Sequence, residues 1–191
     1  MLMPTALLAQ REPARRPEPF FQDTALGPGP RRAFTFGIVG YTGGLWQPSG
    51  IELGMLWRLG QRALTSAGAS ITLGSFTQDQ AVYIGRSQGF FAAIGFTLRQ
   101  PILTLAEVGS ERNPAYVRFE TALDAGWSKD FNSPLPQGPS SLRAGLLAGI
   151  SFGSRTALGQ SVSIMFGPSV FMGQATTTHG EFVLRFRMPG R

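Results

Sequence analysis

From residue 33 to the end of this 191-residue chain, apolar side chains alternate with small or polar ones. The clearest run lies near the C-terminus, where Phe182, Leu184 and Phe186 alternate with residues that include Arg185 and Arg187. A period of two places successive side chains on opposite faces of a β-strand, and the two faces then meet different surroundings. The alternation therefore predicts an all-β fold.

Eight runs carry this alternation, and they predict eight strands joined by hairpin connections. The runs lie at about 33–42, 49–62, 68–76, 89–108, 115–128, 141–153, 158–173 and 181–188. Pro101 interrupts the fourth run, and because proline lacks a backbone N–H it predicts either a bulge within one strand or a turn between two. We expect a closed antiparallel up-and-down barrel of eight strands. Ten strands are the alternative, if the fourth run is split and residues 81–86 also pair.

Composition excludes several other classes of protein. Charged residues make up 15% of the chain, against roughly 25% in an average soluble domain. No stretch approaches the roughly 18–20 apolar residues of a transmembrane helix. Cysteine is absent, which excludes disulfide scaffolds, thiol nucleophiles and cysteine metal sites. A net charge of +6 is compatible with a nucleic-acid partner. The arginines are scattered through the strands, however, so we do not expect nucleic-acid binding.

The chemistry of the two strand faces predicts where each one points. One face carries bulky aliphatic and aromatic side chains, and the other carries mostly Gly, Ser, Thr and Ala with a few charges. Small residues suit the narrow interior of an eight-strand barrel, and a bulky apolar exterior suits lipid. We therefore expect a transmembrane barrel whose lumen is filled by small residues and a network of charges.

The expected lumen network contains more arginines than acids, which leaves guanidinium groups for water, for a loop carboxylate or for an anion. Its members are Glu52, Arg58, Arg99, Arg118, Glu120, Asp124, Arg143, Glu181, Arg185 and Arg187. A second set consists of aromatic residues near expected strand ends, where aromatic girdles meet lipid headgroups. Its members are Tyr41, Trp46, Trp57, Tyr83, Tyr116 and Trp127.

The chain before the barrel divides into two short segments. Residues 1–9 are apolar and end in small residues, so we interpret them as the remnant of a signal peptide whose true start lies further upstream. Residues 10–32 are rich in Pro, Arg and Glu and predict a flexible linker. The barrel is expected to occupy residues 33–191.

Strand rhythm, loop asymmetry and the last strand together give the barrel a resemblance to a known family. Residues 33–191 resemble the small bacterial outer-membrane barrel superfamily that includes the OmpA transmembrane domain, OmpX and the opacity proteins. The segment Glu181–Met188 is similar to the terminal signal that the barrel-assembly machinery recognises in that superfamily, although this chain ends Met-Pro-Gly-Arg and not on Phe. The resemblance implies a Gram-negative outer-membrane location, contact with outer-membrane lipid and lipopolysaccharide, and outward-facing loops at 77–88 and 131–140. It carries no site motif.

Three other functions are alternatives to a structural or interaction role without enzymatic activity. A soluble or envelope-attached lipid-binding barrel, similar to a lipocalin, would turn its apolar face inward. A lipid-modifying enzyme would need His179, the chain's only histidine, which we expect in an outer loop with Ser169 on the adjoining strand. A small anion pore would need an open lumen. No residue pattern predicts a cofactor or a metal site, and Asp79 and Asp130 are expected alone in loops.

Overall fold

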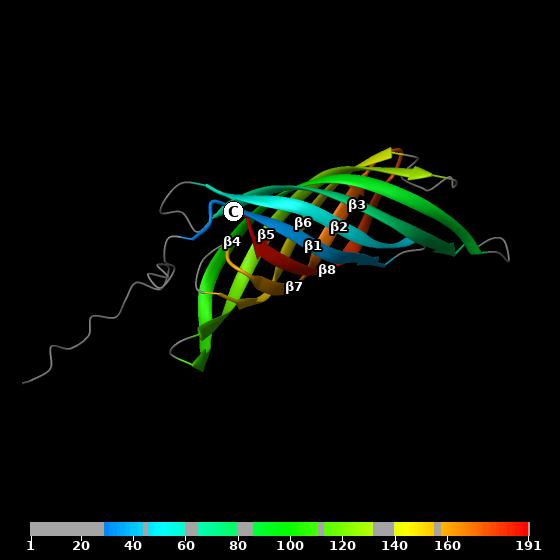
Figure 1. Ribbon diagram of the computed structural model, residues 1–191. Coiled ribbons are helices and arrows are strands. Elements are labelled where there is room, and N and C mark those ends of the chain that lie inside the picture. The colour runs from blue at the N-terminus through cyan, green and yellow to red at the C-terminus, as the bar shows by residue number, and fades with distance from the viewer. Residues whose placement is uncertain are drawn as a thin grey trace, which may run out of the picture.

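The computed structural model describes residues 29–43, 46–59, 65–79, 86–110, 113–131, 140–154 and 158–190, which form one ring of eight antiparallel strands (Figure 1). The strands are β1 (Arg32–Thr42), β2 (Trp46–Arg58), β3 (Ser66–Asp79), β4 (Arg86–Ser110), β5 (Asn113–Phe131), β6 (Ser140–Gly153), β7 (Ser161–Met172) and β8 (Thr176–Pro189). The predicted up-and-down barrel of eight strands is confirmed. In the described part of the chain, no helix is long and apolar enough to cross a membrane.

The ring closes because β1 pairs with both β2 and β8. Stepping from one paired residue to the next around the ring, a path that starts at Arg32 returns to β1 at Thr42, a stagger of ten residues. A stagger of this kind tilts the strands against the barrel axis, and eight tilted strands leave an interior just wide enough for side chains. The pairing therefore determines how little room the interior has.

Hairpin connections define two ends of the barrel. The terminal end is where β1 begins and β8 ends, and the loop end is the opposite one, where β1 ends and β8 begins. The outward loops expected at 77–88 and 131–140 both fall at the loop end. Residues 80–85 and 132–139 of those loops lie outside the described residues, as do residues 1–28 with the expected signal-peptide remnant and most of the expected linker.

β4 runs through Pro101 as one strand of 25 residues. Its pairing with β5 shifts register between Pro101 and Leu103 and again between Thr104 and Ala106. The bulge reading of Pro101 is therefore confirmed, and the turn that would have given ten strands is not found in the described residues. β3 accompanies β4 only as far as Arg99, so the β4–β5 hairpin projects beyond its neighbours at the terminal end (Figure 1).

Apolar clusters occupy the interior towards both ends. Near the terminal end, Leu158 from the turn after β6 packs with Ala33 and Leu56, and all three side chains are buried. A larger cluster runs from the middle of the barrel to the loop end. It comprises Val39, Tyr41, Phe76, Phe91, Ala122, Leu147, Met165, Phe171 and Val183. Charged side chains lie between and among these clusters, so the described interior is filled by both apolar and charged side chains.

Tight pairing of β6 with β7 predicts that the barrel will not tolerate a methyl group at Gly149. A Cβ built at that position would lie 1.9 Å from the carbonyl oxygen of Ile164, which is backbone and cannot move aside. Overpacking of this kind costs about 1–3 kcal/mol, so Gly149→Ala should lower the unfolding midpoint measured by denaturant titration of the detergent-folded chain. Gly40→Ala is the matched control, since nothing lies within 4 Å of a Cβ there. Equal midpoints for the two variants would contradict the β6–β7 packing.

Candidate functional site

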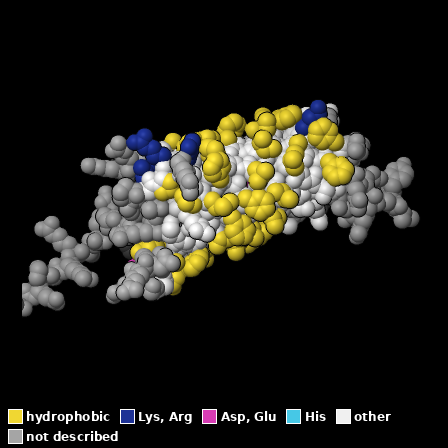
Figure 2. Space-filling model, in the orientation of Figure 1, with side chains coloured by type: hydrophobic (Ala, Val, Ile, Leu, Met, Phe, Trp, Pro, Cys, Tyr) yellow, Lys and Arg dark blue, Asp and Glu magenta, His cyan; other side chains and the backbone are white. Residues whose placement is uncertain are grey.

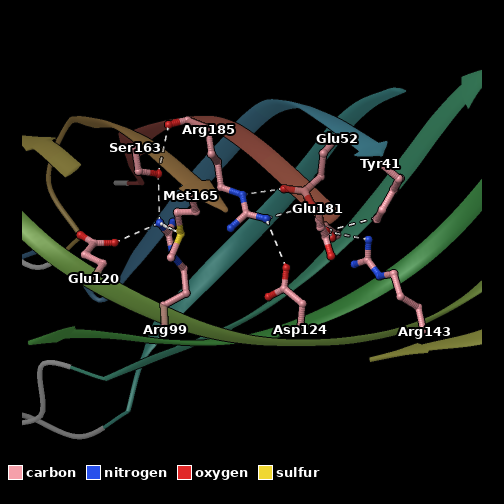
Figure 3. A network of polar contacts seen from close by, with 11 residues as sticks. Tyr41, Glu52, Arg99, Glu120, Asp124, Arg143, Ser163, Met165, Glu181 and Arg185 are labelled. Atoms are coloured by element: carbon pink, nitrogen blue, oxygen red, sulfur yellow. Dashed lines mark hydrogen bonds and ion pairs between the residues drawn. The ribbon is translucent and has the colours of Figure 1, made fainter. Parts of the chain in front are cut away.

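The interior charges form a connected network of charged and polar side chains inside the barrel (Figure 3). The structure places nine of the ten expected lumen residues in the interior with side chains that are almost fully buried. The tenth, Arg58, lies half-buried at the end of β2. The nine buried side chains come from β2, β4, β5, β6 and β8.

The middle of the network is a bidentate ion pair across the lumen. Arg185 of β8 donates from Nε and Nη2 to the two carboxylate oxygens of Glu52 on β2, at 2.6 and 2.9 Å. The same guanidinium lies 3.9 Å from a carboxylate oxygen of Asp124 on β5. The planar guanidinium matches the carboxylate in two parallel hydrogen bonds, which is the strongest geometry for such a pair. One arginine thus ties three strands together.

Towards the terminal end, one carboxylate is shared by two arginines. Glu120 accepts from Arg99 at 2.9 Å and from Arg187 at 3.3 Å, and the hydroxyl of Ser151 donates to it at 2.6 Å. Arg99 also donates to the hydroxyl of Ser163 at 3.0 Å. These contacts link β4, β5, β6, β7 and β8 around one acidic group.

Towards the loop end, a third pair joins β6 to β8. Arg143 donates to Glu181 at 3.1 Å, and the hydroxyl of Tyr41 donates to the same carboxylate oxygen at 3.3 Å. The Arg143 guanidinium also lies 5.6 Å from the centre of the Tyr41 ring, within the range of a cation–π contact. The three groups of the network therefore follow one another along the barrel (Figure 3).

Two further buried charges lie at the opposite ends of this series. Arg118 donates to the carbonyl oxygen of Ser154 at 2.9 Å, near the terminal end. Asp130, expected in a loop, belongs instead to β5 and is buried near the loop end. It lies on the same strand face as Asp124, six residues earlier, so the alternation could have identified it had the strand been extended far enough.

Asp130 changes the charge balance that the sequence suggested. Among the described residues, the buried charged side chains are five arginines and five acids, if the histidine is taken as neutral. The expected excess of arginine came from counting the half-buried Arg58 and omitting Asp130. By this count, the buried side chains of the described residues show no excess of arginine over acid.

The aromatic residues divide between the two sides of the wall. Trp57 and Trp127 are 44% and 42% exposed on the outside, Trp57 near the terminal end and Trp127 towards the loop end. Tyr41 and Tyr116 were expected at a membrane interface and are instead buried. Their hydroxyls donate to Glu181 and to Glu107, at 3.3 and 3.1 Å.

The strand alternation explains the burial of Tyr41, since it shares a face with the buried Val39. Trp46 begins β2, but its side chain lies outside the described residues, as does the whole of Tyr83.

His179 is not in a loop, because β8 begins three residues before it. Its side chain is buried, with Nδ1 at 2.8 Å from the carbonyl oxygen of Gly43 and Nε2 at 3.1 Å from the hydroxyl of Thr177. Ser169 lies opposite it on β7, but the Ser169 hydroxyl points to the carbonyl oxygen of Ala144 at 3.5 Å. These hydrogen bonds give His179 a structural place and do not assemble a Ser–His pair. No group of three or more acidic, His or Cys side chains among the described residues could hold a metal ion.

The outer wall contrasts with the interior. Among the described residues, 28 large apolar side chains are exposed, by 38% to 65%. Where exposure is described, the exposed charged side chains are Arg31, Arg32, Glu107 and Lys129, which lie near the barrel ends or on the projecting β4–β5 hairpin. On the face seen in Figure 2, hydrophobic side chains are spread along the wall, and basic ones lie near the ends.

Two comparisons with known proteins found no relative of this chain. No protein-family model matches the chain, and a search of curated proteins found no match either.

Breaking the central ion pair should destabilise the barrel strongly. Glu52→Gln leaves Arg185 buried without its bidentate partner, and removing one member of a buried pair costs about 3–5 kcal/mol. We expect a matching fall in the free energy of unfolding, measured in detergent with urea. Arg58→Gln, on the same strand but half-exposed, should change that free energy by no more than about 0.5 kcal/mol. Similar losses for the two variants would show that the interior pair does not stabilise the barrel as its geometry suggests.

Proposed function

We propose that this chain is an integral outer-membrane β-barrel protein with a structural or interaction role. The main support for this proposal is the distribution of side chains, which is the reverse of that in a soluble protein. Bulky apolar groups lie on the outer wall, and paired charges lie inside. In water, an exposed apolar patch larger than a few hundred Å² marks an interaction surface. Here the apolar surface extends over all eight strands, and a lipid bilayer is the environment that would cover a surface of that extent.

Ring closure supports the same proposal. A membrane interior offers no hydrogen bonds to the backbone, so only helices and closed barrels cross it. The continuous ring from β1 to β8 meets that requirement. The two exposed tryptophans towards opposite ends are placed as interface anchors would be.

The interior argues against the alternative of a soluble lipid carrier. A lipocalin-like barrel needs its apolar face to line an internal cavity, whereas this lumen holds ion pairs and buried apolar clusters. The same packing disfavours an anion pore, because the clusters near both ends leave side chains in the path. Among the described residues, no serine hydroxyl is paired with His179, and we propose no catalytic role.

In this proposal the partners are outer-membrane lipid and lipopolysaccharide, with the barrel-assembly machinery acting during insertion. The contacts of biological interest would come from the connections at the loop end, 77–88 and 131–140. In this proposal the protein acts through the ends and the outer wall of the barrel and not through its lumen.

The test is a charge placed in the middle of the outer wall. Leu146 is 55% exposed near the centre of β6, and an arginine at the bilayer midplane of a barrel costs about 2–4 kcal/mol. Leu146→Arg should therefore reduce the yield of folded barrel in lipid vesicles, scored as the band that shifts on boiling before gel electrophoresis. Lys129→Arg, which keeps a charge at the loop end, should fold like the unmodified chain.

A different set of results would contradict the membrane location. A chain that stays in solution without detergent, shows no heat-dependent band shift and gains solubility from Leu146→Arg would be a soluble barrel. The membrane proposal would then be wrong.

A further inference from the structure

The side chains on the outer wall differ in size, and a recess runs along β7. Val162 is paired with Phe152 of β6 on one side and with Phe186 of β8 on the other. Both phenylalanines are exposed, by 47% and 43%, whereas Val162 is half-buried between them. A small side chain flanked by two large ones leaves a recess in the wall.

Two adjoining cavities extend this recess along the wall. One, of about 770 Å³, opens near the terminal end, and the other, of about 410 Å³, lies further along β6 and β7. They share Phe152 and Val162 and therefore adjoin, and the two together are called the groove. Both volumes fall in the range of ligand pockets, roughly 300–1,000 Å³. The inner part is lined by Gly149, Ile150, Phe152, Val162, Ile164 and Phe166, and therefore offers only apolar contacts and backbone.

The groove changes character at the terminal end. Ser154, Gln160, Ser161 and Arg187 line it there, next to Phe186 and Met188. Arg32 lies just beyond, exposed at the start of β1, where its carbonyl oxygen accepts from the backbone N–H of Gly190 at 2.9 Å. It points outward, since it shares a strand face with the exposed Phe34. The groove thus has an apolar length and a polar mouth, with the exposed Arg32 just beyond its lining.

We propose that this groove binds one acyl chain of an anionic phospholipid, with the phosphate beside Arg32. The inference rests on the proposed membrane location. A single acyl chain suits the inner part of the groove, which lies between β6 and β7, whereas the terminal part is broader and its lining reaches from β1 to β5. An exposed guanidinium attracts a phosphate by charge and by paired hydrogen bonds. Among the described residues, Arg31 and Arg32 are both exposed at this end of β1, and the lipid phosphate would lie beside Arg32.

The experiment compares lipid retention by matched variants. The full chain, folded in neutral detergent, is titrated with phosphatidylglycerol or phosphatidylcholine, and bound lipid is counted by native mass spectrometry. We expect one phosphatidylglycerol to bind at least tenfold more tightly than phosphatidylcholine. Val162→Trp, which fills the recess, should lower that affinity at least tenfold. Ala69→Trp, on the outward face of β3 across the barrel, should leave it unchanged.

Two further variants test the contact between Arg32 and the lipid headgroup. Arg32→Gln should make the two lipids bind alike, while Lys129→Gln, at the loop end, should keep the preference. Equal affinity of the unmodified chain for both lipids, tighter binding of lipid A, or equal effects of the two tryptophans would each overturn the proposal.

A folding check separates these outcomes from failure of the proposed function. Every variant is first tested for the heat-dependent band shift, with Val162→Phe as a smaller filler in case Val162→Trp does not fold. A shifted band without selective lipid retention refutes the groove alone. Absence of the shift in the unmodified chain refutes the membrane barrel, and the groove with it.

Discussion

Closure of the strand ring between β1 and β8 is the constraint on which the rest of the structure depends. Once eight strands close with a stagger of ten residues, the width of the interior is determined, and it admits side chains but little else. Every inward position must then be a small residue, an apolar residue that packs, or a charge that finds a partner. Gly149 is an example of the first kind, because a methyl group there would collide with the backbone of β7. The outward positions carry no such restriction of size, and they hold most of the bulky side chains.

The interior charges are stable only as a set. Taking an ion out of water costs several kcal/mol, and a partner recovers that cost only with good geometry and further hydrogen bonds. Glu120 forms ion pairs with both Arg99 and Arg187. Arg185 pairs with Glu52 and lies close to Asp124. Because partners are shared, removing one side chain alters the surroundings of the others, and the effects of separate substitutions will not add. The network also joins strands far apart in the chain, since Glu52 and Arg185 are separated by 133 residues. It therefore fixes the relative positions of strands that the backbone ladder joins only to their neighbours.

Local patterns in the sequence were enough to predict the strands and the side that most of their residues face. The alternation identified eight strands, and the missing N–H of Pro101 indicated either a bulge or a turn, of which the structure has the bulge. Errors arose where a judgement by residue type replaced the alternation. Tyr41 was expected at an interface because tyrosine is common there, although its position in β1 marks it as inward. Asp130 and His179 were assigned to loops because the apolar alternation fades before the strands end. The partners of each charge could not be predicted, because they depend on how the ring closes and not on any local spacing.

The side chains that occupy the lumen narrow the ways in which a barrel of this kind can act. Transport through the interior would require the apolar clusters and the ion pairs to move together, and the shared partners make that costly. Function is then left to the two ends and to the outer wall. On that wall small side chains such as Ala148 lie among the large ones, and Val162 leaves a recess between Phe152 and Phe186. If the wall faces lipid, as we propose, general contact with fluid lipid would be served equally well by a larger side chain at this position. In that proposal a specific lipid explains the recess and the polar mouth beside Arg32, since one chain can fill the recess while its phosphate meets the arginine.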